Sequence, residues 1–119
     1  MTQVILHLAK LEDWAEAVST GLYRTSTRDK SLADVGFIHA STPEQLASVA
    51  SSVYKDFLGE LVILEMDLAQ FEQAGLKVLF EDGGDDEQYP NIYGPIPVEL
   101  VSNTKPAVMI EGALQALEQ

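Results

Sequence analysis

Apolar residues recur along the chain in two patterns, unbroken runs and runs spaced like one face of a helix. Unbroken runs predict strands buried on both faces, and runs that alternate with polar residues predict strands with one exposed face. The predicted strands cover residues 3–9, 22–24, 35–40, 61–66, 76–81, 100–102 and 107–110.

Apolar residues three and four positions apart predict helices. One stripe predicts a helix over residues 11–20, and Gly21 is a suitable residue to end it. Shorter helices are predicted over residues 68–74 and 112–117. Helices and strands mix along the chain without a regular strand–helix–strand rhythm. This mixture favours the α+β class and a single small domain over residues 1–119.

The strongest helix signal lies in the middle of the chain. Thr42 can cap the first free N–H groups of a helix, and Gln45 completes a capping box. An apolar stripe at helical spacing then continues to Phe57 or Leu58. Gly59 is predicted to close this helix.

Polar segments between these elements predict loops. Residues 25–32 are polar and mixed in charge, and residues 82–87 form an acidic loop whose spacing does not match a calcium-binding EF-hand. Residues 89–97 are rich in Pro and Gly and predict a rigid turn. That turn either presents Tyr93 to a ligand or packs as a structural corner.

The charge balance excludes several classes of function. The chain of 119 residues has 19 acidic and 7 basic residues, a formal net charge of −12. Such a chain repels nucleic acids and anionic membranes, and no apolar run is long enough to span a bilayer. The absence of cysteine excludes disulfides and thiolate chemistry. We expect a cytoplasmic protein with a small-molecule ligand and without nucleic-acid or membrane partners.

The two histidines are the strongest candidates for chemistry. His7 lies in the first predicted strand, where it is either a hydrogen-bonded core residue or a pocket residue. His39 ends a predicted strand beside the positive end of the next helix. It either helps to bind a phosphate or carboxylate there or fixes the corner between strand and helix as a structural residue. A serine-hydrolase interpretation fails, because Ser41 lies in no Gly-x-Ser-x-Gly motif.

A zinc site is a weaker alternative. It would need His7, His39 and a carboxylate from Glu65 or Glu81 to meet through the folding of the chain. No motif marks such a set, so no metal site is predicted.

A set of residues in a fixed order resembles a known bacterial family. These residues are His7, Trp14, Gly21, Tyr23, Ser31-Leu32, Gly36-Phe37-Ile38-His39-Ala40-Ser41-Thr42, Gln45, the strand over residues 61–67 and Tyr89-Pro90-Asn91-Ile92-Tyr93-Gly94-Pro95-Ile96-Pro97. Their order and spacing resemble domain-of-unknown-function family 952 over roughly residues 4–108. The family has no established biochemical role.

The resemblance implies a fold similar to that of the ADP-ribosyltransferase superfamily, a split α+β fold with a mixed or antiparallel sheet that cradles NAD. By that analogy His7 would hold a ribose, and His39 or Tyr93 would line the nicotinamide pocket. Glu65 or Glu81 would supply the acid, so the catalytic candidates are these two and His39. The other residues expected to bind the ligand are Tyr23, Ser41, Thr42 and Asn91.

Two residues depart from the family pattern, which usually has His at the position of Asn91 and Cys at that of Ala40. Asn91 cannot shuttle a proton near neutral pH. We therefore expect a pocket for a nucleotide or similar phosphorylated metabolite, with turnover of NAD as the reaction that the resemblance implies. The alternative is a non-catalytic module that docks a partner through residues 82–87 and 89–97. The sequence leaves open whether the protein is an enzyme.

Overall fold

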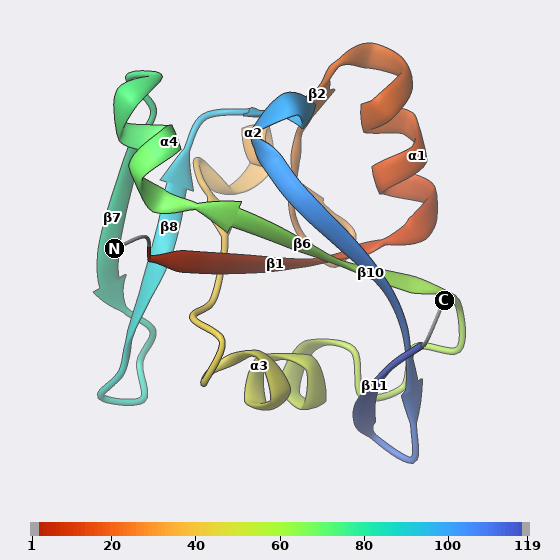
Figure 1. Cartoon of the computed structure of the whole chain (residues 1–119). Helices are drawn as coiled ribbons and strands as arrows, with labels where there is room; N and C mark the ends of the chain where they lie inside the picture. The colour runs from red at the N-terminus through yellow and green to blue at the C-terminus, as the bar shows by residue number, and fades with distance from the viewer. Residues whose placement is uncertain (1–2, 118–119) are drawn as a thin grey trace.

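Two antiparallel sheets form the centre of the molecule (Figure 1), and the computed structural model describes residues 3–117. The larger sheet has the order β1-β6-β10-β11, with β1 (Val4–Lys10), β6 (Leu61–Asp67), β10 (Val101–Ile110) and β11 (Ala113–Ala116). The smaller sheet has the order β5-β8-β7, with β5 (Ile38–His39), β8 (Gln88–Tyr93) and β7 (Lys77–Asp82).

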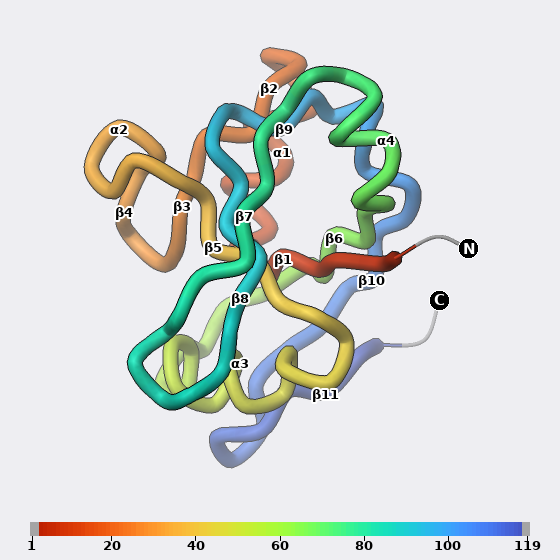
Figure 2. Tube along the Cα trace, turned by 90° about the vertical axis from the view of Figure 1, so that its left-hand side faces the viewer, coloured from red at the N-terminus to blue at the C-terminus, as the bar shows by residue number. Residues whose placement is uncertain are grey.

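The two sheets meet where the chain leaves β5. Leu6 of β1 and Ser41 exchange two backbone hydrogen bonds, each with an N···O distance of 2.7 Å. Figure 2 shows β5 and β8 passing beside β1 at this point. Because Leu6 precedes His7 and Ser41 follows His39 closely, the junction brings the two histidines together.

Side chains of the larger sheet alternate between two apolar clusters, as expected of strands covered on both faces. One cluster contains residues that share a face with His7: Ile5, Ala9, Val62, Leu64 and Met66. Helices α1 (Leu11–Thr20) and α4 (Leu68–Gln73) add Ala17 and Phe71 to this cluster. The other cluster packs Leu6, Leu8, Leu61 and Ile63 against α3 (Leu46–Val53).

The structure confirms the α+β class and the strongest periodic segments. The predicted strands over residues 3–9, 61–66 and 76–81 correspond to β1, β6 and β7, and the predicted helices over residues 11–20 and 68–74 correspond to α1 and α4. Gly21 ends α1 with a φ of 92°. The predicted piece over residues 22–24 forms β2 (Leu22–Tyr23), which pairs with β9 (Ile96–Pro97), and a short 3-10 helix, Val98–Leu100, follows β9.

The prediction of a loop over residues 25–32 is wrong. This segment forms a hairpin of β3 (Thr25–Thr27) and β4 (Lys30–Ser31). The polar sequence of this segment gives no apolar pattern from which a strand could be predicted. Its buried residue is Ser26, whose hydroxyl donates to the carbonyl of Phe37 at 2.5 Å. A hydrogen-bonded polar residue can occupy a buried position that periodicity assigns to an apolar one.

The strand predicted over residues 35–40 is shorter than expected, because its first residue, Val35, belongs to a helix. Ser31 and Asp34 form a capping box that begins α2 (Leu32–Val35). Gly36 ends α2 with a φ of 100°. Only Ile38–His39 pairs as β5.

Helix α3 is also shorter than predicted, ending at Val53 and not at Phe57 or Leu58. Arg28 donates a hydrogen bond to the carbonyl of Val53 at 3.1 Å, which satisfies one of the free carbonyls at the helix end. At its start, Thr42 makes no side-chain cap, but its backbone N–H donates to the Gln45 side chain at 3.0 Å. Gly59 therefore lies in the connection to β6 and does not close the helix.

The expected rigid turn over residues 89–97 is largely a strand, β8. Pro90 lies inside this strand although proline has no backbone N–H. Its carbonyl accepts from Ala40 N–H at 3.0 Å, so the position of the missing N–H faces the chain just beyond the end of β5. Likewise, the two strands predicted over residues 100–102 and 107–110 form one strand, β10, which runs through Pro106.

The helix predicted over residues 112–117 is wrong, because β11 pairs there with β10. Glu111 and Gly112 both have positive φ, 51° and 80°, and turn the chain back on itself. The hydrogen bonds of the hairpin outweigh a weak local preference for helix. None of the helices within residues 3–117 has both the length and the apolar character needed to cross a lipid bilayer.

Candidate functional site

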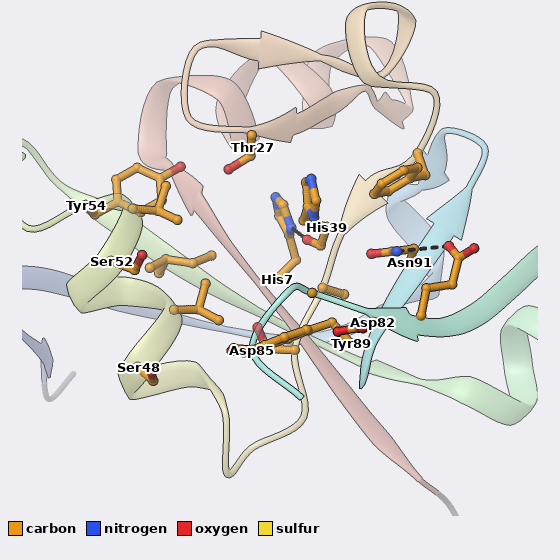
Figure 3. A pocket seen from close by; sticks show the side chains of 18 residues that line it. His7, Thr27, His39, Ser48, Ser52, Tyr54, Asp82, Asp85, Tyr89 and Asn91 are labelled. Atoms are coloured by element: carbon orange, nitrogen blue, oxygen red, sulfur yellow. Dashed lines mark hydrogen bonds between the residues drawn. The ribbon is translucent and has the colours of Figure 1, made fainter. Parts of the chain in front are cut away.

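A cavity of about 550 Å³ opens at the junction of the two sheets (Figure 3). Helix α3 forms one wall, β5 and the hairpin of β7 and β8 form the opposite wall, and Thr27 lies above the two histidines. A volume of this size is typical of sites for small organic ligands. The lining residues on which the chemistry depends are His7, His39, Ser41, Glu81 and Asn91.

His7 is bound on both sides of its ring. Its Nδ1–H donates to the carbonyl of His39 at 2.5 Å, because a carbonyl oxygen only accepts. Its Nε2 therefore accepts from the Tyr23 hydroxyl at 2.9 Å. The side chain is 3% exposed, and burial lowers the pKa of His7 to about 4. His7 is thus a neutral, hydrogen-bonded core residue whose ring nitrogens are occupied.

Tyr23 supports His7 and does not line the cavity. The side chain is 1% exposed, and its ring stands edge-on to the His7 ring with 5.1 Å between centroids. Burial raises the pKa of the Tyr23 hydroxyl, so the proton needed for the bond to His7 stays in place. Of the residues expected to bind a ligand, Tyr23 thus contacts His7 and lies outside the cavity lining.

His39 differs from His7, because its ring is exposed in the cavity. No hydrogen bond to the ring of His39 occurs within residues 3–117, and Phe37 packs edge-on against it at 4.8 Å between centroids. Partial withdrawal from water lowers the pKa of His39, which favours the neutral imidazole at pH 7. A neutral imidazole offers one donor and one acceptor to a ligand.

Asn91 contributes the most unusual atom of the site. The residue is 6% exposed, and its Nδ2 donates to Glu81 Oε1 at 3.0 Å. Its Oδ1 is buried and has no hydrogen-bond partner among the described residues. Asn91 lies at the right of Figure 3, where a dashed line marks a hydrogen bond of its side chain. An orphaned acceptor of this kind costs about 1–3 kcal/mol unless a partner arrives.

Glu81 is held by two donors. The Tyr93 hydroxyl also donates to Glu81 Oε1, so Tyr93 contacts this carboxylate and does not itself line the cavity. The hydrogen bonds from Asn91 and Tyr93 lower the pKa of Glu81 below its ordinary value. Glu81 is therefore an ionised carboxylate at neutral pH.

The other carboxylate candidate, Glu65, lies away from the cavity. In the register of β1 and β6 it pairs with Leu6, whereas His7 pairs with Leu64, so Glu65 points to the opposite face. Its Oε2 accepts from Asn103 Nδ2 at 2.8 Å. Of the two carboxylates, therefore, Glu81 lines the same cavity as the histidines, and Glu65 does not.

Ser41 and Thr42 take different positions. Ser41 is 3% exposed and lines the cavity, whereas Thr42 lies outside the lining. The zinc alternative also fails, since no group of three or more potential metal-ligating His, Cys, Asp or Glu side chains occurs within residues 3–117.

The sequence did not indicate several lining residues. Ser48, Ser52 and Tyr54 come from α3 and the turn after it, and Asp82, Asp85 and Tyr89 come from the hairpin of β7 and β8. The acidic loop over residues 82–87 is exposed to water throughout, as a solvated turn is, and its residues Asp82, Gly83 and Asp85 also line the cavity. Its one sequence signal was the adjacent aromatic residue, Tyr89, whose hydroxyl donates to Asp85 at 2.5 Å.

The comparisons with known proteins identify a family. The sequence model of the family described as "Protein of unknown function (DUF952)" matches residues 8–104. The chain belongs to this family. The X-ray structure of protein CC0527 from Caulobacter crescentus resembles this DUF952 protein with a TM-score of 0.78 and 26% sequence identity, over 94% of this chain and 93% of that one. A double mutant of CC0527 matches equally. No curated protein matches the chain.

The charge of the DUF952 pocket is negative. Glu81, Asp82 and Asp85 line it, and no Lys or Arg of residues 3–117 does. Arg28 lies beside α3 but binds Asp56 at 2.6 Å. A phosphate inside this pocket would meet carboxylates and no cation, which disfavours the phosphorylated ligand expected from the sequence.

Proposed function

We propose that this DUF952 protein binds a small organic ligand in the pocket between α3 and the hairpin of β7 and β8. The observation that carries this proposal is the buried, unpartnered Oδ1 of Asn91 in the lining of a cavity of about 550 Å³. Buried acceptors are almost always hydrogen-bonded, so an exception inside a cavity points to a donor that a ligand supplies.

The hydrogen bond from Asn91 to Glu81 prepares the amide for such a ligand. Because Glu81 is ionised and only accepts, the amide turns its Nδ2 toward Glu81 and leaves Oδ1 for another partner. The His39 ring adds a second polar group with no partner within residues 3–117. A few fixed polar groups in a cavity are the usual basis of ligand orientation.

Glu81 favours one chemical reaction as a second candidate. The resemblance of the family to ADP-ribosyltransferases implies loss of nicotinamide from NAD, with a carboxylate that stabilises the oxocarbenium-like charge. An ionised Glu81 suits that role better than the role of a general acid. In this second candidate the nicotinamide end of NAD occupies the pocket, and its phosphates remain outside the acidic lining.

A ligand screen tests the proposal. The intact protein is titrated with nicotinamide, adenosine, NAD, ADP-ribose and inorganic phosphate while ¹H–¹⁵N NMR spectra and melting temperatures are recorded. We expect an organic compound, and not phosphate alone, to shift the amides around His39 and Asn91. Release of free nicotinamide from NAD tests the second candidate separately.

Three variants make the screen specific. His39→Ala and Asn91→Leu change the pocket and are expected to abolish binding. Asn103→Leu is the matched control, because Asn103 also donates to a glutamate, Glu65, but lies outside the lining. If neither these compounds nor the charged probes described below shift the pocket amides of the folded wild type, the proposal is wrong, and a module that docks a protein partner becomes the better account.

A further inference from the structure

We infer that the ligand of this pocket is a small organic cation that carries N–H groups. The inference rests on the ligand-binding function proposed above and names the class of ligand. Two independent features lead to it, the carboxylates of the lining and the buried acceptor Asn91 Oδ1. Each feature favours a donor, and together they favour a donor that carries positive charge.

The carboxylates give the cavity a negative surface. Glu81, Asp82 and Asp85 lie on the same hairpin and all contribute to the lining. Both hydrogen bonds that Glu81 accepts end on Oε1, which leaves the acceptor capacity of Oε2 for a ligand. A concave surface of one sign concentrates ligands of the opposite sign.

Two basic side chains beside the cavity are engaged elsewhere. Arg28 donates to Asp56 at 2.6 Å, and its guanidinium lies 5.7 Å from the centroid of the Tyr54 ring. Lys77 lies over the Tyr93 ring, 5.7 Å from its centroid. Neither residue lines the cavity, so neither neutralises the carboxylates at its surface.

Asn91 offers a ligand only a hydrogen-bond acceptor, at one fixed position. Its Nδ2 is taken by Glu81, so the part of the amide left for a ligand is the acceptor Oδ1. A ligand carboxylate or phosphate would place its own oxygen atoms against this acceptor, and that contact is repulsive. An ammonium or amidinium group donates to Oδ1 while its charge lies near Glu81.

Aromatic side chains complete the cation site. Phe37 and Tyr89 line the cavity, and the face of an aromatic ring attracts an organic cation. Phe37 is held in place by His39 and Tyr93, with ring centroids at 4.8 and 5.3 Å. A flat cation with N–H groups therefore satisfies the ring, the carboxylate and the amide together.

A series of three probes of one shape tests the inference. Benzamidine, benzamide and benzoate share a benzene ring and a planar substituent, but they differ in charge from positive to neutral to negative. Each is titrated into the intact wild-type protein by NMR and calorimetry. We expect benzamidine to bind most tightly, benzoate not to bind at the pocket, and added salt to weaken benzamidine binding.

The same substitution, glutamate to glutamine, at two positions tests which carboxylate attracts the cation. Glu81→Gln is expected to weaken benzamidine about tenfold and benzamide much less, since a charge-assisted contact is lost. Glu65→Gln removes an equal charge on the opposite face, beside Lys105 and Asn103, and is expected to leave both affinities unchanged. An equal effect of the two variants would reduce the preference to the net charge of the protein and overturn the inference.

The outcomes separate the inference from the function on which it rests. If benzoate binds as tightly as benzamidine, or if only neutral compounds shift the amides around Asn91, the cation preference is overturned and the binding function stands. If neither this series nor the preceding screen shifts those amides, both are overturned.

Discussion

The two histidines lie side by side, yet the contacts around each ring give them different capacities. His7 uses both nitrogens, one on the His39 carbonyl and one on the Tyr23 hydroxyl. The ring of His39 is exposed in the cavity with no hydrogen bond within residues 3–117. The sequence allowed either histidine to be structural, and the structure assigns that role to His7.

Burial of His7 predicts a loss of stability in acid. The folded state lowers the pKa of His7 from 6.5 to about 4, so the unfolded state binds the proton first as the pH falls. The free energy of unfolding is therefore fully retained above pH 6.5 and falls between pH 6.5 and 4, by about 3 kcal/mol from this residue. Denaturant unfolding at a series of pH values measures this loss.

Two histidine variants isolate that contribution from the titration of the carboxylates. In His7→Gln most of the component between pH 6.5 and 4 should disappear, because the ring with the larger lowering of its pKa is gone and only the partly exposed His39 ring remains. In His39→Gln it should persist, since the His39 ring is exposed. A wild-type His7 ring that titrates near pH 6.5 by NMR would contradict the prediction.

Substitution of Asn91 is predicted to abolish ligand binding without lowering the free energy of unfolding much. Asn91→Leu removes a buried acceptor that has no partner among residues 3–117, and it also removes one hydrogen bond to Glu81. Because relief of the orphaned oxygen offsets the lost bond, the free energy of unfolding should stay within about 1 kcal/mol of wild type or rise. Ligand binding should be lost, as calorimetry with a ligand from the screen would measure.

The matched control is Asn103→Leu, which removes the exposed bonds of Asn103 to Glu65 and to Thr104 N–H and no orphaned atom. It should leave ligand binding unchanged. A loss of several kcal/mol in Asn91→Leu would instead identify Asn91 as a structural residue of β8.

Among the elements, the short helix α2 does most to position the site, because the chain passes from it directly into β5. Ser31 and Asp34 begin the helix, and Gly36 ends it with a φ of 100°. The next residues place Phe37 and His39 in the cavity wall. The conformation of Gly36 thus fixes where the open histidine lies.

Gly36→Ala is predicted to weaken ligand binding through this geometry. A Cβ at Gly36 would meet no atom within 4 Å, so the cost arises from the backbone and is about 1–2 kcal/mol of unfolding free energy. Relaxation of the strain would shift His39. Thermal unfolding and ligand titration measure the two effects.

Gly21→Ala is a close control for Gly36→Ala. Gly21 also ends a helix with a φ of 92°, and a Cβ added to it would meet no atom within 4 Å, but the residues that follow it, Leu22 and Tyr23, do not line the cavity. The variant should show a similar loss of stability and unchanged ligand affinity. Equal losses of affinity in both variants would contradict a specific role for α2.

At the scale of the whole molecule, the larger sheet holds both apolar clusters together. Strand β6 lies between β1 and β10 and contributes to both clusters, with Leu64 on one face and Ile63 on the other. Helix α3 and the smaller sheet are thereby fixed on one frame, and the cavity forms where they approach each other (Figure 3).

Leu64→Ala should destabilise the whole domain. Leu64 is fully buried at the centre of the sheet, and removal of a buried leucine side chain costs about 2–5 kcal/mol. Leu58→Ala makes the same chemical change at a residue that is 97% exposed and should alter stability by no more than about 0.5 kcal/mol. Chemical denaturation compares them, and similar losses would contradict the assigned core.

The net charge of −12 also belongs to the whole molecule. It predicts that the protein does not bind RNA or DNA at physiological salt, since few basic side chains are present to neutralise phosphates. A fluorescence-anisotropy titration with single- and double-stranded oligonucleotides measures this. Salt-sensitive binding at micromolar concentration would contradict it.

Elements whose burial follows a simple period could be predicted from the sequence alone. Strands β1 and β6 and helices α1 and α4 lie where apolar spacing placed them, because one side of each faces a core. The sequence also indicated that the two histidines lie near the site. It failed where hydrogen bonds between distant residues outweighed local preference, as at Pro90 within β8 and in β11.

The membership of the site, in contrast, depends on contacts between residues far apart in the chain. Both ring nitrogens of His7 are hydrogen-bonded to residues that lie 32 and 16 positions away in the sequence, and no local pattern predicts such contacts. Glu65 and Glu81 both lie on strands, and the register of each strand decides that Glu81 alone reaches the cavity. The negative lining arises because the hairpin of β7 and β8 lies opposite α3, so that its exposed acidic loop also lines the pocket.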